Sequence, residues 1–283
     1  MRMERPADSK LFAKHSEPLL LQKEAENNLP LGIIERWKHS NGGDSTAFML
    51  ELYEGDNLVY ITLRTPPHLW ILPAISTVTR AKIKFLAHFL FENEYEVPGV
   101  LGQSEVVQWF VQSWEECSGQ KGELHMKQGI YRLDKLKKVT KAEGELVVAK
   151  QKDFLFLVDW LLVFSDQTSD SFSRERAEQL ACDMIADQKM HFWEVGGNYV
   201  SMVCRARSTP NGATVNAVFT PDEFKRNGYA TQAVAALTGK LLNDGYQFCA
   251  LYTDLANSTS NSIYQKIGYK AVDQSLVYHF KKS

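Results

Sequence analysis

The feature that most constrains this chain is a strand, a glycine-bearing loop and a helix that follow one another. Residues 213–219 carry apolar side chains at alternate positions and end before Pro221, which indicates a strand that proline terminates. Beyond the loop, apolar residues at helical spacing give a helix over 229–243 one face that packs on a sheet: Ala230, Val234, Leu237 and Leu241. The free amides at the start of this helix, approached through Gly228, predict a site for an anion such as pyrophosphate.

A second motif lies downstream, in the segment 257–269. Its hydroxyl and amide side chains are typical of a helix start, and Gly268 is typical of a helix end. Ile263 and Ile267 are expected on one apolar stripe, with Tyr264 turned off it. Tyr264 could be an ordinary half-buried tyrosine, and without the upstream glycine loop that would be the preferred interpretation.

The second half of the chain predicts a mixed α/β sheet flanked by helices, because strand and helix signals alternate along it. Besides the elements above, we expect strands at 146–149, 191–195, 199–207, 247–253 and 275–281, and helices at 154–164, 173–188 and 258–267.

The first half carries a helix signal over 16–38, with Ser16 as its N-cap and a break at Pro30, followed by a hairpin over 47–64. A second passage, 192–210, has the same layout of strand, tight turn, strand and proline. The match predicts an internal duplication; the alternative is that two common hairpins resemble each other by chance.

A charged stretch, 132–145, separates the halves and places a domain boundary near Ala142, between a lobe 1–141 and a lobe 142–283. Its basic residues are interpreted as a solvated linker rather than a phosphate site: Lys135, Lys137, Lys138 and Lys141.

Composition excludes several classes of partner. The chain has 283 residues, 44% of them hydrophobic, which suffices for two cores, and its formal charge of −2 gives no reason to expect nucleic acid or an anionic membrane. The four cysteines contain no CxxC pair and the N-terminus lacks a secretory pattern, so we expect a cytoplasmic protein. The longest apolar stretch, 154–164, is interrupted by Asp159 and is about half a membrane span.

Taken together and in this order, the glycine loop and the downstream tyrosine helix resemble the GNAT (GCN5-related) superfamily of N-acetyltransferases, in a two-lobed, bacterial-type arrangement. The resemblance covers 142–283 and is strongest over 215–269. It implies a mostly antiparallel sheet and transfer of an acetyl group from acetyl-CoA to a primary amine, with Tyr264 protonating the departing thiolate. The cofactor-binding residues that it implies are Ala217, Val218, Phe219, Thr220, Lys225, Arg226, Asn227, Gly228, Tyr229, Ala230, Thr231, Asn257, Ser260 and Asn261.

Two departures bear on this interpretation. Lys225 stands where the family has Arg or Gln, which matters little if backbone amides hold the pyrophosphate and Arg226 adds a cation. The general base is harder to name, because the 213–219 strand has no carboxylate or histidine and offers only Asn216. The other candidates each also fit a structural role: Glu194, Asp222, Glu223 and Asp254.

Other reactive side chains are better explained by the core. Cys204 and Cys249 fall in predicted strands with no nearby histidine, and His191 falls in a strand beside aromatic residues. No metal site is predicted. A non-catalytic acyl-CoA binding or sensing protein stays open as an alternative, the acceptor is expected to be a small-molecule or peptide amine, and a homodimer stays open.

The first lobe is expected to be a degenerate copy of the same fold that shapes the acceptor site and binds no cofactor. Residues 97–104 resemble a second glycine loop before a helix, whose apolar stripe is Val107, Phe110, Val111 and Trp114. The loop lacks the Arg, Lys or Gln that precedes the glycine in the second lobe. The alternative is that this lobe only stabilises the protein or mediates dimerisation.

Overall fold

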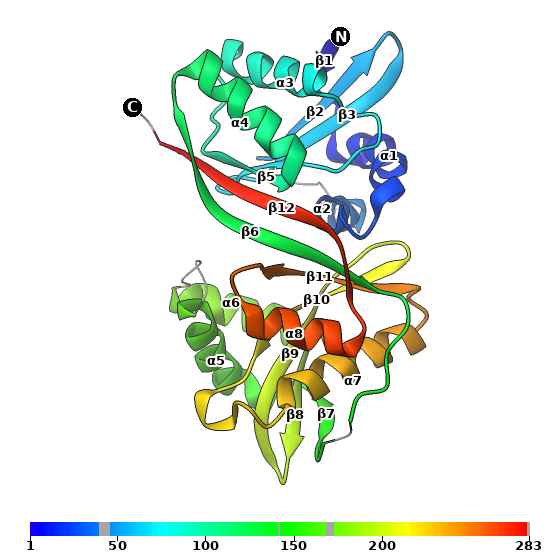
Figure 1. Ribbon diagram of the computed structural model, residues 1–283, viewed down its shortest axis with the longest axis vertical. Coiled ribbons are helices and arrows are strands. Elements are labelled where there is room, and N and C mark those ends of the chain that lie inside the picture. Colours follow the sequence, from blue (N-terminus) through cyan, green and yellow to red (C-terminus); the bar gives the residue numbers. More distant parts are fainter. Residues whose placement is uncertain (40–45, 141, 168–172, 282–283) are drawn as a thin grey trace. The chain divides into compact units, whose positions relative to one another are not determined.

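Helices and strands alternate throughout the computed structural model, which describes residues 1–39, 46–140, 142–167 and 173–281 (Figure 1). The chain divides into two compact units that are interleaved in sequence. Unit 1 comprises 1–131, 252–258 and 271–283, and unit 2 comprises 132–251 and 259–270.

Unit 1 is built on a sheet in the order β1-β2-β3-β4-β5-β12-β6. Its strands are β1 (Arg2–Glu4), β2 (Phe48–Glu54), β3 (Asn57–Arg64), β4 (Trp70–Leu72), β5 (Gly99–Gln103), β6 (Lys121–Leu133) and β12 (Lys270–Lys281). Neighbours from β1 to β4 are antiparallel, β4 and β5 are parallel, and β5 and β12 are antiparallel. Its helices are α1 (Ser9–Leu20), α2 (Asn28–His39), α3 (Arg80–Glu92) and α4 (Ser104–Ser118), with a 3₁₀ turn η1 (Leu21–Lys23).

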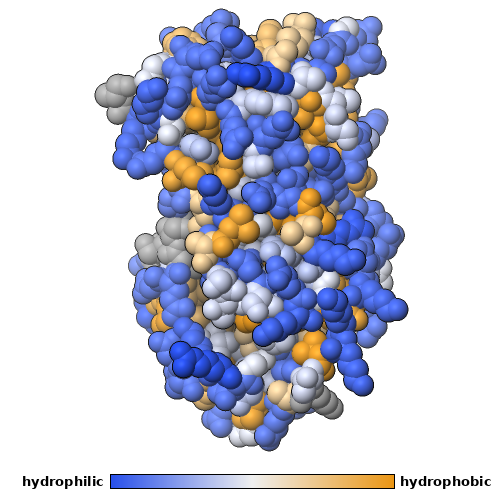
Figure 2. Space-filling view, viewed as in Figure 1, coloured by the Kyte–Doolittle hydropathy of each residue, from blue (hydrophilic) through white to orange (hydrophobic). Residues whose placement is uncertain are grey.

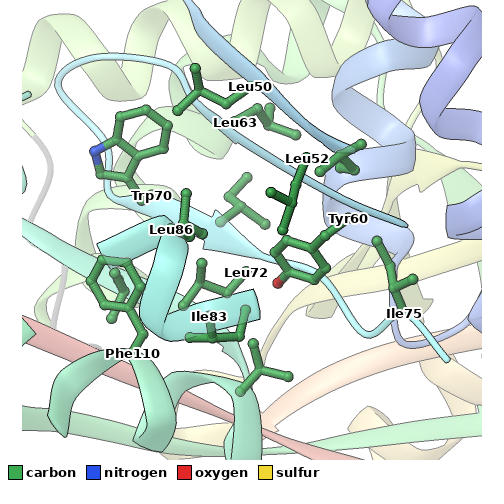
Figure 3. Close-up of a cluster of buried hydrophobic side chains, with 14 of the residues drawn as sticks. Leu50, Leu52, Tyr60, Leu63, Trp70, Leu72, Ile75, Ile83, Leu86 and Phe110 are labelled. Atoms are coloured by element: carbon green, nitrogen blue, oxygen red, sulfur yellow. The ribbon is translucent and has the colours of Figure 1, made fainter. Parts of the chain in front are cut away.

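The core of unit 1 forms where these helices meet the sheet. Figure 3 shows Tyr60, Trp70 and Leu72 from the strands packed with Ile83 of α3 and Phe110 of α4. All five side chains are 0% exposed, and burial of such side chains supplies most of the favourable free energy of folding.

The prediction of a helix over 16–38 with a break at Pro30 is wrong about where the helix starts and where it breaks. α1 begins at Ser9, because the Asp8 carboxylate caps it and accepts a hydrogen bond from the Leu11 amide at 2.8 Å, whereas Ser16 is buried inside it. The chain leaves the helix before residue 28, and Pro30 lies in the first turn of α2, where its missing N–H is not needed. The predicted hairpin and its turn are confirmed as β2 and β3.

Unit 2 has the sheet order β11-β10-β9-β8-β7. Its strands are β7 (Glu145–Val148), β8 (Met190–Val195), β9 (Asn198–Ser208), β10 (Gly212–Phe219) and β11 (Phe248–Asp254), and its helices are α5 (Phe154–Asp166), α6 (Arg174–Ala186), α7 (Tyr229–Asn243) and α8 (Ser258–Ile267), with 3₁₀ turns η2 (Gln151–Asp153) and η3 (Asp222–Phe224). β7 to β10 are antiparallel, and β10 and β11 are parallel. α5 and α6 pack on the face that carries Phe192 and Phe219, and α7 packs against β8, β9 and β10.

The chain contains the same series of elements twice. The series strand, helix, helix, three strands, helix, strand, helix, strand describes β1 to β6 and again β7 to β12. The pairing directions of the first five strands of each series are also the same. The predicted mixed, mostly antiparallel sheet flanked by helices is therefore confirmed, and the repeated hairpin is part of a repeat of the whole fold.

The two units do not divide the chain at the predicted boundary. The linker residues 132–140 belong to unit 2, while β12, the last strand of the second series, pairs with β5 in unit 1. Lys135, Lys137 and Lys138 are exposed, and the Lys137 amide donates to the Ile267 carbonyl at the end of α8 at 2.9 Å. Lys141 lies outside the described residues.

The glycine loop predicted at 97–104 is a strand instead. Gly99 and Gly102 belong to β5, and a Cβ at Gly102 would lie 2.0 Å from the Leu72 carbonyl oxygen. These glycines therefore permit close approach of neighbouring strands rather than of a pyrophosphate.

Candidate functional site

The strand predicted to meet the cofactor, β10, is irregular near its end. Its pairing with β9 shifts between Asn216 and Phe219, where β10 holds one residue more than β9. Ala217, inside this bulge, has φ +46°, a left-handed conformation that costs an L residue roughly 1–2 kcal/mol. Because such strain persists where the surroundings impose it, and often at functional sites, the bulge makes this part of β10 a candidate site.

The pairing of β10 with its other neighbour, β11, is also short. The paired residues run from Gly212 with Phe248 to Thr214 with Ala250, five residues before β10 ends. Val218 is half-buried, between buried Ala217 and Phe219. The end of β10 thus offers backbone that its sheet partners do not fully use, as the predicted role of Ala217, Val218 and Phe219 requires.

Ser201 holds this end of β10 in place and was missed by the sequence reasoning. Its buried hydroxyl donates to the Phe219 carbonyl at 2.9 Å and accepts from the Thr220 hydroxyl at 2.9 Å. The signal in the sequence was a single serine between Val200 and Met202 in a buried strand, which is too common to identify a role.

The loop after β10 leads directly into the uncapped start of α7. The N-cap is Gly228, with φ +79° and no side chain to accept hydrogen bonds from the first-turn amides. No atom lies within 4 Å of the point where a Cβ would stand. Free amides, the positive end of the helix dipole and open space around Gly228 fit a pyrophosphate group.

The cations of this loop are exposed. Lys225 pairs with Asp222 at 2.5 Å, and Arg226 takes φ +68°. The Asn227 side chain donates to the carbonyls of Phe224 and Lys225 at 3.2 and 3.3 Å. Asn227 therefore shapes the loop, while Arg226 is the cation near α7 for which the described residues show no ion pair.

Tyr264 lies on the buried face of α8, contrary to the prediction that it turns off the apolar stripe. It is 8% exposed, whereas Ile263 is only half-buried. Its ring lies 6.0 Å from that of Tyr269, whose hydroxyl is 2.8 Å from the Thr238 hydroxyl on α7. Burial raises the pKa of Tyr264 to about 12. In the described part of the chain, no hydrogen bond or ring contact joins Tyr264 to β10.

The remaining predicted cofactor residues are divided between the units. Tyr229, Ala230 and Thr231 form the first turn of α7, and Ser260 and Asn261 lie on α8, all in unit 2 and all half-buried. Asn257 belongs to a unit 1 segment, where its amide donates to the Asp254 carbonyl at 3.1 Å.

The surroundings of the candidate general bases do not single out any one of them. Asp222 and Glu223 are exposed in η3, and Asp254 accepts from the Ala256 amide at 2.9 Å, as in a turn. Glu194 is half-buried on β8, opposite Tyr199. Asn216 is exposed. None of these residues is identified as the base by its contacts.

The other reactive side chains behave as core residues, as predicted. Burial raises the pKa of the Cys204 and Cys249 thiols to about 12, which keeps both protonated and unreactive. His191 is 5% exposed, its Nδ1 lies 3.2 Å from the Lys189 carbonyl oxygen, and burial lowers its pKa. Within the described ranges, no three metal-ligating side chains gather in a way that could hold an ion.

The corresponding loop of unit 1 makes hydrogen bonds with side chains. In the repeated order of elements, the loop between β4 and α3 corresponds to the loop before α7. There the Thr79 hydroxyl caps α3, and the buried Asn27 amide both donates to and accepts from the Ala74 backbone at 2.8 Å. The first turn of α3 thus has a side-chain cap, whereas the first turn of α7 has none.

Comparison with known proteins gives a match over the same region. A family model described as FR47-like protein matches residues 197–277, which run from the β8–β9 turn through α7 and α8 into β12. A search of curated proteins found no match to this chain. No helix in the described ranges is long and apolar enough to cross a membrane.

Several solved structures share the fold over nearly the whole chain. A GNAT-family acetyltransferase from Colwellia psychrerythraea is 12% identical, with 99% of this chain and 100% of that chain covered and a TM-score of 0.60. A GCN5-related N-acetyltransferase from Sphaerobacter thermophilus is 11% identical, with 98% and 94% covered and a TM-score of 0.63. A tandem GNAT protein from the clavulanic acid biosynthesis pathway is 9% identical, with 98% of each chain covered and a TM-score of 0.58. The chain therefore has a two-lobed GNAT fold.

Proposed function

We propose that the protein is an acetyl-CoA-dependent N-acetyltransferase whose chemistry takes place in unit 2. The observation that carries the proposal is the bulged end of β10 followed at once by an uncapped helix start at Gly228, both within the FR47-like segment. Unit 1 has the same elements, but the Thr79 hydroxyl caps its corresponding helix, α3. We expect such an enzyme to work in the cytoplasm.

Different residues of unit 2 would bind different parts of acetyl-CoA. The amides at the start of α7 and the guanidinium of Arg226 would hold the pyrophosphate, and the backbone from Ala217 to Phe219 would align the pantetheine arm. Bound acetyl-CoA supplies a thioester: a neutral amine forms a C–N bond to the acyl carbon, the C–S bond breaks, the amine loses a proton and the sulfur gains one.

Tyr264 is the proposed donor of the proton to sulfur. A phenol with a pKa of about 12 stays protonated throughout the neutral range, as a donor must. It is also a weaker acid than a thiol of ordinary pKa, about 8.5, so complete transfer of the proton would be uphill. We therefore expect Tyr264 to stabilise the leaving thiolate by donating a hydrogen bond to it. The proton would be transferred completely only as the sulfur is desolvated.

A non-catalytic acyl-CoA binding protein is the second candidate. It is favoured by the absence, within the described residues, of a carboxylate or imidazole in hydrogen-bond contact with β10, since an attacking ammonium must lose a proton. Water can serve as that base when the amine is unprotonated at the assay pH. Catalysis then needs no such side chain, and the enzyme stays the better explanation of the site.

Acetyl-CoA turnover against a panel of amines decides between the two. The panel includes 2-phenylethylamine, putrescine, spermidine and a lysine peptide, and release of free thiol is followed at pH 8. Amine-dependent thiol release that Tyr264→Phe slows by about 10²-fold supports the enzyme. Binding of CoA with no thiol release for any amine in the panel favours the binding protein.

A further inference from the structure

Two histidines on neighbouring strands of unit 1 have no part in the cofactor site described above. His125 belongs to β6 and His279 to β12, and these two strands lie side by side in the sheet (Figure 1). The centroids of the two imidazole rings are 4.9 Å apart, and the ring planes are inclined by 79°. Because the two residues are far apart in the sequence, only the pairing of β6 with β12 brings them together.

Both imidazoles lie on the solvent-facing side of these strands. Two residues further along each strand, Glu123 of β6 and Lys281 of β12 form an ion pair with 2.7 Å between the carboxylate oxygen and Nζ. Two cross-strand contacts that shift by two residues in opposite directions fit an antiparallel pairing with all four side chains on one face. His125 and His279 are exposed, whereas Phe280, which alternation places on the other face, is buried. An ion in solvent can therefore reach both rings.

Exposed polar side chains are common on this protein and by themselves indicate no site. On the face shown in Figure 2, hydrophilic residues predominate and hydrophobic residues lie among them in small groups. His68 of unit 1 is also exposed, and within the described residues its ring contacts no second imidazole. The pair of His125 and His279 differs from such a single side chain because two imidazoles in contact can bind one ion together.

The spacing of the two rings fits chelation of one metal ion. An imidazole nitrogen binds Zn²⁺ at about 2.0–2.1 Å, and the ring centroid lies about 1.1 Å behind that nitrogen, so each centroid would be about 3.2 Å from the ion. Two such rings have centroids about 4.5 Å apart at a right angle between the ligands and about 5.2 Å apart at the tetrahedral angle. The observed 4.9 Å lies between these values. Imidazole is a ligand for Zn²⁺, Ni²⁺ and Cu²⁺, whereas Mg²⁺ and Ca²⁺ prefer oxygen.

The charges on the same face are close to balanced. The Lys281 ammonium would repel a metal cation, and its pairing with Glu123 offsets that repulsion. The hydrogen bond from Lys281 lowers the pKa of Glu123, and the nearby His279 and His125 lower it further, so this carboxylate is ionised beside the pair. Lys127, two residues after His125, is exposed on the same face and opposes binding weakly. Two ligands at such a surface fit a dissociation constant on the order of 10 µM, far weaker than a four-ligand zinc site.

We propose that His125 and His279 bind one divalent transition-metal ion of the zinc class, with water completing its coordination, and that this ion fastens β12, the last strand, to β6. An ion that binds only the folded, paired strands stabilises that pairing. The inference does not rest on the proposed function, because neither histidine belongs to the acetyl-CoA site and metal binding is measured without turnover.

The test is calorimetric titration of the full-length protein, prepared without a polyhistidine tag, with Zn²⁺ at pH 7.5. Zn²⁺ should bind with a dissociation constant on the order of 10 µM, and Mg²⁺ should not bind at the same concentrations. His125→Gln and His279→Gln should each weaken this binding by about tenfold or more, because one imidazole then remains. His68→Gln is the matched control, since it removes an exposed histidine of unit 1 that has no such partner, and it should bind Zn²⁺ like the wild type.

Hydrogen–deuterium exchange with and without Zn²⁺ tests whether the ion fastens the strands. Slower exchange is expected for amides 122–127 and 276–281 in the wild type and in His68→Gln, and no change in His279→Gln. Both substituted positions are exposed, so the variants should keep the wild-type circular dichroism spectrum. The inference is overturned if the wild type binds no Zn²⁺ at about one millimolar, if His125→Gln and His279→Gln bind as tightly as His68→Gln, or if Zn²⁺ leaves exchange in β12 unchanged.

Discussion

Two substitutions of Gly228 separate the effect of backbone conformation at the start of α7 from the effect of charge there. At φ +79° a side chain strains the backbone by roughly 1–2 kcal/mol, while open space around the position rules out a steric clash. Gly228→Ala should therefore lower the stability of unit 2 by about 1 kcal/mol. Gly228→Glu carries the same strain and adds a negative charge where the pyrophosphate is expected.

The size of the charge effect follows from distance and solvent. Two unit charges about 6 Å apart repel by about 0.7 kcal/mol at the dielectric constant of water and about 2.8 kcal/mol at a value of 20. Because Gly228 is exposed, a value near 1.4 kcal/mol is expected, which is about a tenfold loss of CoA affinity relative to Gly228→Ala.

Calorimetric titration with CoA, together with thermal unfolding, measures both effects. Gly55→Ala is the control for strain, because Gly55 has φ +60°, open surroundings and a place in the β2–β3 turn of unit 1. It should lower stability by a similar amount and leave CoA affinity unchanged. Equal CoA affinities for Gly228→Ala and Gly228→Glu would refute the assignment of α7 as the pyrophosphate site.

Three further predictions concern pH and the core. His191 has a folded-state pKa below its ordinary 6.5, so its contribution to stability is present above pH 6.5 and is lost as pH falls through the folded value; urea unfolding from pH 7.5 to 5 should show a smaller loss for His191→Gln than for wild type. Tyr264, with a pKa of about 12, should give no alkaline loss of kcat below about pH 11, and a loss near pH 9 that Tyr264→Phe abolishes would contradict its environment. Asn27→Ala removes hydrogen bonds to Leu20 and Ala74 and should cost about 2–4 kcal/mol without creating a second CoA site, which denaturant unfolding and titration would show.

The sequence predicted the ends of most elements in the second series, because the residues that begin or end these elements lie at or next to those ends. Pro221, Gly228 and Gly268 stand where a strand ends, a helix begins and a helix ends, and the structure confirms each boundary. The turn at Gly196 and Gly197 was found in the same way. Where the signals are local, hydrophobic periodicity and capping residues are enough to place the ends of an element.

The errors arose where distant contacts decide. The glycines of β5 resembled a ligand loop, and only the Leu72 carbonyl beside Gly102 reveals close strand packing. Of the two residues predicted on the apolar stripe of α8, Ile267 is buried but Ile263 is only half-buried, and Tyr264, expected off the stripe, lies on the buried face. The role of Asn27 depends on Ala74, which is 47 residues away. Because β12, the last strand of the second series, pairs with β5 of the first series, the extent of each unit depends on contacts between distant segments, and the boundary near Ala142 stays a prediction.

Hydrogen–deuterium exchange of the full-length protein with and without acetyl-CoA tests the central claim most directly, because it locates the cofactor without needing an acceptor. The account predicts slower exchange for amides 217–220 and 226–232 in unit 2 and no change for 73–82, the corresponding loop of unit 1. Protection confined to 73–82, or none anywhere at saturating acetyl-CoA, would contradict it.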